Sequence, residues 1–257
     1  MLRANRELVL VIAGLFLFLP FLAFALQMSG TEAFDAPEGA RPTPEQMNAA
    51  VATFVEANWL AMLLIGLAQM AGAIALIRIL ADRARPTVGS SLAAVPGLLL
   101  PMIAAQLVST LLLQLPLALP AFLPGAVAGL FGLLGLAAAI YLSVKFSLVS
   151  PALVLGDTRN PLTAIRASWH ATKGNSFRLF AFYVLLMIAT LVLLLVASLF
   201  FGLIFALLGE RGAQIASSVF LAFSFALIYT GAYAVVAAVY RQVSARKAVS
   251  VPRSAAD

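Results

Sequence analysis

The sequence predicts an all-α, polytopic membrane protein with six transmembrane helices and an amphipathic helix at the cytoplasmic interface. Three observations lead to this fold class. Of the 257 residues, 63% are hydrophobic and only 10% are charged, whereas charged residues make up about a quarter of a typical soluble domain. Long uncharged runs alternate with short polar stretches. The basic residues gather in every second polar stretch, the distribution that sets orientation in a membrane.

The uncharged runs define the expected spans, because a helix needs about 20 residues to cross the hydrocarbon core. The run 86–144 has 59 residues and is long enough for two spans. We expect it to divide at Pro116, Pro120 and Pro124-Gly125, since clustered proline and glycine favour a turn. The chain 1–257 is then a single membrane domain with spans at about 8–27, 57–80, 92–115, 124–147, 178–206 and 213–240.

Local signals refine the first three spans. The first apolar run is longer than the roughly 7–15 residues of a signal-peptide core, so Pro20 should kink a retained helix. The sequence 43–46 (Thr-Pro-Glu-Gln) is typical of a helix start with a capping box. The second helix should therefore run over residues 44–80 and project beyond the hydrocarbon core. Pro96-Gly97 and Pro101 predict a kink or break in the third span.

Two features of the fourth span bear on packing and burial. Gly125 and Gly129 form a GxxxG motif, which permits close contact between helices. Lys145 lies within one or two helical turns of the cytoplasmic end. We expect its side chain to extend to the cytoplasm.

The positions of the basic residues predict the orientation. Fourteen of the 16 lie on the side of the predicted membrane that also holds both termini. Arg41 and Arg211 lie opposite, with six of the ten acidic residues. Since basic residues are enriched in cytoplasmic loops, we expect a multi-pass membrane protein with both termini in the cytoplasm.

The polar stretch 156–180 should contain the interfacial helix, over residues 161–173. Asn160 is a suitable N-cap, Pro161 suits the first turn, and Gly174 can end the helix. One side carries Leu162, Ile165 and Trp169, which we expect in the acyl boundary, beside a basic stripe of Arg166, His170 and Lys173. The third side should pack on the bundle and consists of small residues: Thr163, Ala164, Ala167, Ser168 and Ala171.

The junction with the next span is a candidate site for anionic lipid. Asn175 or Ser176 should cap that span, whose first amides carry a partial positive charge. The candidate lipid contacts are Arg166, Trp169, Lys173, Gly174, Asn175 and Arg178. The alternative is that these cations only set the orientation and hold the connecting segment against the membrane.

The run 145–180 resembles the signature of the glycerophosphoryl diester phosphodiesterase membrane domain family and of the related YciC-like inner-membrane proteins. The matching residues are Pro151, Ala164, Arg166, Ser168, Trp169, Thr172, Lys173, Gly174 and Asn175. Gly156-Asp157 stands where the family often has a glutamate. The resemblance implies a location in a bacterial inner membrane. It concerns the membrane module only, because a phosphodiesterase barrel needs about 250 further residues.

No motif predicts catalysis. The sequence has no HExxH, P-loop or GxSxG motif, no cysteine and one histidine, so thiolate and multi-histidine metal sites are excluded. We expect a non-enzymatic protein without cofactor or metal that contacts phospholipids or organises the membrane. Basic patches between apolar spans fit an anionic leaflet and not nucleic acid. Self-association is left open.

Two other functions compete with lipid contact. A small transporter or permease component is favoured by the polar residues Gln106, Gln114, Ser143 and Ser147 in the spans. The third hypothesis is a membrane-embedded enzyme of glycerophosphodiester or lipid metabolism, and it is the weakest because no catalytic constellation is present.

Overall fold

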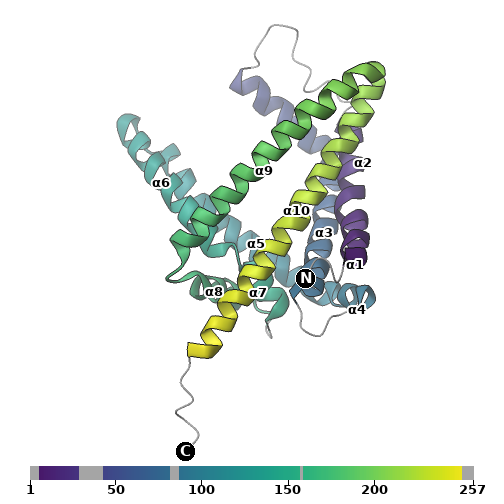
Figure 1. Ribbon diagram of the computed structural model, residues 1–257. Coiled ribbons are helices and arrows are strands. Elements are labelled where there is room, and N and C mark those ends of the chain that lie inside the picture. Colours follow the sequence, from purple (N-terminus) through teal and green to yellow (C-terminus); the bar gives the residue numbers. More distant parts are fainter. Residues whose placement is uncertain (1–5, 29–42, 82–86, 157–158, 251–257) are drawn as a thin grey trace, which may run out of the picture.

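The computed structural model describes residues 6–28, 43–81, 87–156 and 159–250 (Figure 1). In this part of the chain every regular element is a helix. Five segments are long and apolar enough to cross a membrane: Arg6–Gln27, Glu45–Ala81, Val95–Phe122, Gly125–Leu155 and Ser176–Val243. The all-α, polytopic fold class is confirmed. Arg41 and Asp157, which enter the predictions above, lie outside the described residues.

The last of these segments is a pair of helices. It contains α9 (Ser176–Phe205), the short 3-10 helix η4 (Ala206–Leu208) and α10 (Gly209–Ser250). Gly209 has a φ of 71°, a conformation that glycine adopts without steric cost, and the chain reverses there. In Figure 1, α9 and α10 meet at this turn and diverge towards the other end. With the other four segments, the described residues therefore form six long rods. Their assignment to one membrane domain stays a prediction.

The first rod is irregular near Pro20, as expected. It consists of α1 (Arg6–Ala13), the π-helical segment η1 (Gly14–Phe18) and α2 (Leu19–Met28). Proline has no N–H and its ring crowds the carbonyl four residues earlier. The π-helical segment lies immediately before Pro20, where that crowding falls. It also packs closely on the second rod, because a Cβ added to Gly72 would lie 2.8 Å from the Cβ of Phe16.

The second rod is α3 (Pro44–Ala81), a helix of 38 residues and so about 57 Å long at 1.5 Å per residue. Its predicted capping box is confirmed. The Thr43 N–H donates to Oε1 of Gln46 at 2.9 Å, and the Gln46 N–H donates to Oγ1 of Thr43 at 3.3 Å. The last turns of α3 are almost entirely buried, whereas Glu56 and most residues of its first half are exposed.

The third and fourth rods form a hairpin. The predicted break in the third span lies at Ala94, between α4 (Val88–Ala93) and α5 (Val95–Ala118), and Pro96 occupies the first turn of α5. The division expected at the cluster from Pro116 to Gly125 is found there, although α5 itself continues through Pro101 and Pro116. The turn is made by η3 (Leu119–Phe122), after which α6 (Gly125–Phe146) begins.

The close contact expected at the GxxxG motif lies elsewhere. Gly129 has no neighbour within 4 Å of an added Cβ, and Gly125, with a φ of 48°, serves the turn. The contact is made by Gly135, whose added Cβ would overlap the backbone carbonyl of Pro116. Pro116 thus lies where α5 comes nearest to α6.

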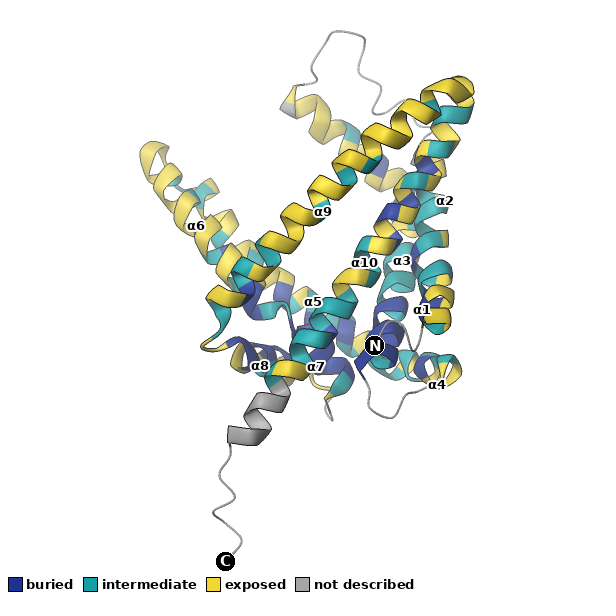
Figure 2. Cartoon of the chain, viewed as in Figure 1, coloured by how far each residue is buried: buried dark blue, intermediate teal, exposed yellow. Residues whose placement is uncertain are grey.

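Two short helices close one end of the bundle: α7 (Val149–Leu155) and α8 (Pro161–Thr172). Figure 2 shows the buried residues concentrated at this end, while α9 and the far part of α6 are largely exposed. A core cluster here joins α3, α5, α7 and α8 and includes Ile77, Met102, Leu153 and Ala164. A second cluster joins the first rod, α3 and α10 and includes Ile12 and Leu76.

Candidate functional site

The candidate site is built on the local structure of α8, which follows the sequence signals closely. Oδ1 of Asn160 accepts a hydrogen bond from the Leu162 N–H at 2.9 Å, and Pro161 occupies the first turn. The helix ends at Thr172, and Gly174 follows with a φ of 83°. The cap and the glycine stop are therefore confirmed. They fix where α8 ends and α9 begins.

The sides of α8 differ in part from the prediction. The small residues Ala164, Ser168 and Ala171 are buried against the bundle, as expected. The placement of Ile165 in the acyl boundary is wrong, because this side chain is buried in the core cluster with α7. The helix is rotated so that its contact surface includes Ile165, while Thr163 is exposed. Only Leu162, 55% exposed, and Trp169 remain on the outer apolar side.

Ser168 joins α8 to the break between α6 and α7. Its Oγ donates to the Lys145 carbonyl at 2.6 Å and accepts from the Leu148 N–H at 3.2 Å. A helix end leaves backbone groups without partners, and this buried hydroxyl supplies partners to both helices at once. Ser168 is therefore a structural residue. The position of Ser168 on the small-residue side of the helix predicted its burial, but not these hydrogen bonds.

The prediction that Lys145 reaches the cytoplasm is wrong. Its side chain is only 3% exposed, and Nζ lies 5.3 Å from the centroid of the Tyr141 ring and 5.1 Å from that of Trp169. The two rings meet edge to face with centroids 6.0 Å apart. Such faces attract an ammonium group. Because α8 crosses the end of α6, Trp169 covers a lysine that would otherwise extend outwards.

The expected side-chain cap of α9 is also absent. Asn175 is the N-cap residue, but its side chain makes no capping hydrogen bond. The hydroxyl of Ser176 donates to the Thr172 carbonyl at 3.0 Å instead. Asn175 has φ −121° and ψ 8°, not the extended conformation of a capping residue, because the chain turns directly from Gly174 into α9. Its amide is thus available to a ligand.

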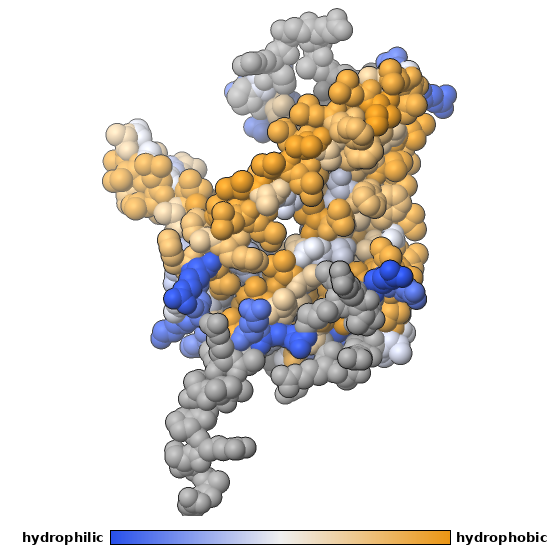
Figure 3. Space-filling model, in the orientation of Figure 1, coloured by the Kyte–Doolittle hydropathy of each residue, from blue (hydrophilic) through white to orange (hydrophobic). Residues whose placement is uncertain are grey.

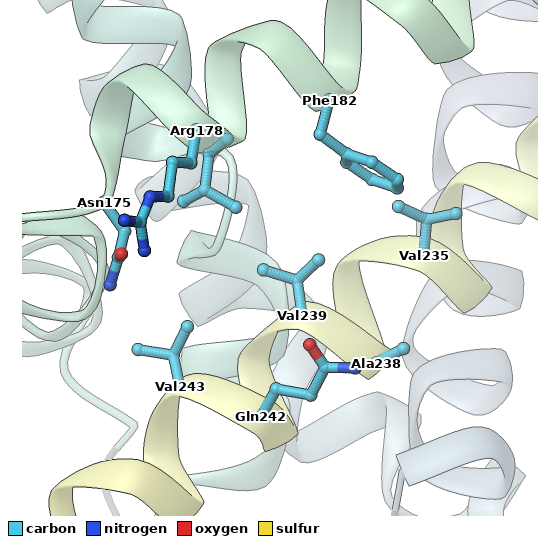
Figure 4. Close-up of a pocket in the computed structure, with 9 residues that line it drawn as sticks. Asn175, Arg178, Phe182, Val235, Ala238, Val239, Gln242 and Val243 are labelled. Atoms are coloured by element: carbon cyan, nitrogen blue, oxygen red, sulfur yellow. The ribbon is translucent and has the colours of Figure 1, made fainter.

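A pocket of about 370 Å³ lies between the start of α9 and the end of α10 (Figure 4). Asn175, Arg178 and Gln242 supply polar groups, and Arg178 is the one charged residue among the nine that line it. The other six are Leu179, Phe182, Val235, Ala238, Val239 and Val243. The pocket therefore combines an apolar lining with a single cation, a composition typical of sites for amphiphilic ligands.

The six predicted contact residues fall into three groups. Asn175 and Arg178 line the pocket. Arg166, Lys173 and Gly174 are exposed at the same end of the bundle but do not line it. Trp169 packs on Lys145 and Tyr141 while part of its surface stays exposed. The α10 wall was missed because it is far away in the sequence: Gln242 is 64 residues from Arg178.

Of the four polar residues that favour a transporter, none lines this pocket, and three form hydrogen bonds to helices. Nε2 of Gln106 donates to Oγ of Ser150 at 3.1 Å. The hydroxyls of Ser143 and Ser147 donate to carbonyls of their own helix at 2.7 and 2.8 Å. Gln114 lies exposed on the outside of α5. Such bonds are the usual role of polar side chains between membrane helices.

Comparison with known families identifies the chain. The model of the membrane domain of glycerophosphoryl diester phosphodiesterase matches residues 97–251. The chain belongs to this family. The matched region of the membrane-domain family includes α8 and both walls of the pocket. No curated protein and no solved structure matches the chain. With its long apolar helices, this family member is a multi-pass integral membrane protein.

Proposed function

We propose that this membrane-domain protein is a non-enzymatic component of a bacterial inner membrane that contacts anionic phospholipids at its cytoplasmic end. The observation that supports this most directly is the position of Arg166, Lys173 and Arg178. All three are exposed at the end of the bundle where the exposed apolar surface of α9 begins. Phe177, 81% exposed, lies next to Arg178. Cations bordering an apolar surface match the boundary between phosphates and acyl chains.

The arrangement of the rods supports the proposed orientation. The first helix begins, and α10 ends, at the end of the bundle that carries α8 (Figure 1). Figure 3 shows hydrophilic residues gathered at this end, below a hydrophobic surface over α9 and α10. Because basic residues favour the cytoplasmic side, we assign this end to the cytoplasm. Accessibility of a cysteine introduced at Ser176 or at Ala213 to a membrane-impermeant thiol reagent in intact cells tests the assignment. Labelling at Ala213 alone is expected.

The lipid contact is tested by replacing the three cations together. In the variant Arg166→Gln/Lys173→Gln/Arg178→Gln, we expect less anionic phospholipid to co-purify in mild detergent, because each lost cation near a membrane surface removes about 1 kcal/mol of attraction. Thermal unfolding should change little, since the three side chains are exposed. Arg211→Gln at the opposite end is the control. An unchanged amount of anionic lipid in the triple variant contradicts the proposal.

The non-enzymatic part of the proposal has its own test. The purified protein is incubated with glycerophosphodiesters, and release of glycerol phosphate is followed. We expect no release above that from a mock preparation. Hydrolysis that co-elutes with the protein and disappears in the triple variant would make the same site catalytic and overturn this part of the proposal.

A further inference from the structure

The two walls of the α9–α10 pocket share the same polarity gradient. On α9, Asn175 and Arg178 come first and Phe182 follows one turn later. On α10, which runs in the opposite direction, Gln242 and the apolar Val243 stand at the polar end and Val235 at the apolar end. Figure 4 shows Asn175 and Arg178 at one side of the cavity and Phe182 and Val235 at the other. The cavity is therefore polar towards the end with α8 and apolar towards the interior of the membrane.

The polar end suits a phosphate group. A guanidinium presents a fork of N–H donors that matches phosphate oxygens. No acidic residue lines the pocket, so Arg178 is not neutralised within it. The side-chain amides of Asn175 and Gln242 can donate to ester or phosphate oxygens.

The apolar end suits the first part of an acyl chain. Phe182, Val235 and Ala238 give it an aliphatic and aromatic lining. Beyond Phe182 the outer side of α9 continues with Leu185, 67% exposed, and further exposed apolar residues. An acyl chain leaving the pocket would therefore stay on an apolar surface. The cavity volume is near the lower bound of roughly 300 Å³ for small-molecule sites, enough for the glycerophosphate region and not for whole chains.

We propose that this pocket binds one anionic glycerophospholipid in a defined orientation. The phosphate lies at Arg178, the ester region lies between Asn175 and Gln242, and the acyl chains pass Phe182 and Val235 into the bilayer. The inference rests on the proposed function but goes further, because it replaces a diffuse charged surface by a site with one lipid per chain. The occupant is a lipid and not a second copy of the protein, since the pocket's single charge and its polarity gradient match a phospholipid.

Native mass spectrometry of the full chain tests the site. The protein is released from mild detergent after incubation with phosphatidylglycerol or phosphatidylcholine, and bound lipids are counted as collision energy rises. We expect one phosphatidylglycerol molecule per chain to stay bound at collision energies that remove all other lipids. With phosphatidylcholine we expect no lipid to stay bound at those energies. Ala238→Trp fills the cavity and should abolish the retained phosphatidylglycerol. Arg178→Gln should lower its occupancy by about tenfold, the factor for one lost charge-assisted bond.

Two control variants separate this site from the general surface charge. Arg241→Gln, next to the pocket, and Arg211→Gln, at the opposite end, remove exposed cations that do not line it, and both should keep the retained lipid. If Ala238→Trp fails to elute as a folded protein, the smaller change Val239→Phe takes its place. Retention of phosphatidylglycerol by a folded, pocket-filled variant overturns the site, as does equal retention of phosphatidylcholine. Conversion of a wild-type dimer to a monomer by Ala238→Trp, without loss of lipid, also overturns it.

The outcomes distinguish this inference from the proposed function. If the triple variant loses anionic lipid but Ala238→Trp does not alter the last retained lipid, surface contact stands and the defined site is wrong. If neither variant changes lipid binding, both proposals fail.

Discussion

Helices α8 and α9 are neighbours in the chain and have opposite surroundings. Five of the 12 residues of α8 are buried, among them Ala164, Ser168 and Thr172. Of the 30 residues of α9, only Leu179 is buried, although the helix consists largely of leucine, phenylalanine and valine. In a membrane the lipid already satisfies large apolar side chains. In α8 the small and hydroxyl-bearing residues mark the protein contact, joined by Ile165, whereas the long apolar side chains of α9 are left for lipid.

The largest expected effect comes from deleting equivalent leucine side chains in the two regions. Leu153 on α7 is fully buried beneath α8, whereas Leu193 on α9 is 65% exposed. Leu153→Ala should lower the free energy of unfolding by about 2–5 kcal/mol because it leaves a cavity. Leu193→Ala should change it by less than about 0.5 kcal/mol. Unfolding by sodium dodecyl sulfate in mixed micelles measures both. Equal losses would mean that α9 is covered by protein.

A pair of glycines in α6 tests whether close backbone contact stabilises the α5–α6 hairpin. Gly135→Ala places a methyl group against the Pro116 carbonyl and should cost about 1–3 kcal/mol of unfolding free energy through overpacking. Gly129→Ala meets open space and should be neutral or stabilise by up to about 1 kcal/mol. The same detergent titration compares the two. A greater loss of unfolding free energy from Gly129→Ala than from Gly135→Ala would show that the close contact is made at the GxxxG motif.

Hydroxyl deletions give a third comparison. Ser168→Ala leaves the Lys145 carbonyl and the Leu148 N–H without their partner and should cost about 1–3 kcal/mol. Thr190→Ala on α9 removes only a bond to the Leu186 carbonyl of its own helix, so its effect should be within about 0.5 kcal/mol. Hydrogen exchange at the amide of Leu148 gives a local readout. Unchanged protection of this amide from exchange in Ser168→Ala would show that Ser168 does not stabilise the break between α6 and α7.

The smallest effect is expected from the two tryptophans. Trp169→Leu removes one of the two rings on Lys145 and should cost about 0.5–2 kcal/mol. Trp59→Leu, at a position 60% exposed on α3, should cost less. The melting temperature in mild detergent ranks the two variants. Because part of the Trp169 surface is exposed, a loss seen only in lipid nanodiscs would assign its contribution to the membrane and not to Lys145.

Features fixed by neighbouring residues could be read from the sequence. The Thr43–Gln46 capping box, the Asn160 cap and the Gly174 stop each depend on side chains within a few residues, and each is present. Asn175 shows the limit of this reasoning. Its residue type favours capping, but the direct passage from α8 into α9 gives it an unsuitable backbone conformation.

Features that depend on packing between helices could not be read in this way. Lys145 is buried because α8 crosses α6 and brings Trp169 over it. The distance of Lys145 from the end of the span, which is all that the sequence gives, does not reveal this contact. The pocket needs Arg178 and Gln242 on opposite walls. Asn175 and Arg178 on the α9 wall were therefore predictable from the sequence, and the α10 wall requires the fold.

The turn at Gly209 has a consequence for how the protein is made. Only η4, a turn of three residues, separates α9 from α10, a connection short enough for the two helices to enter the bilayer together as a hairpin. We expect α9 and α10 to leave the translocation machinery as a preformed hairpin, carrying Glu210 and Arg211 across together. This hairpin would then pack against α3, α5, α7 and α8, which are synthesised earlier. The proposed lipid pocket between α9 and α10 would be the last part of the protein to form.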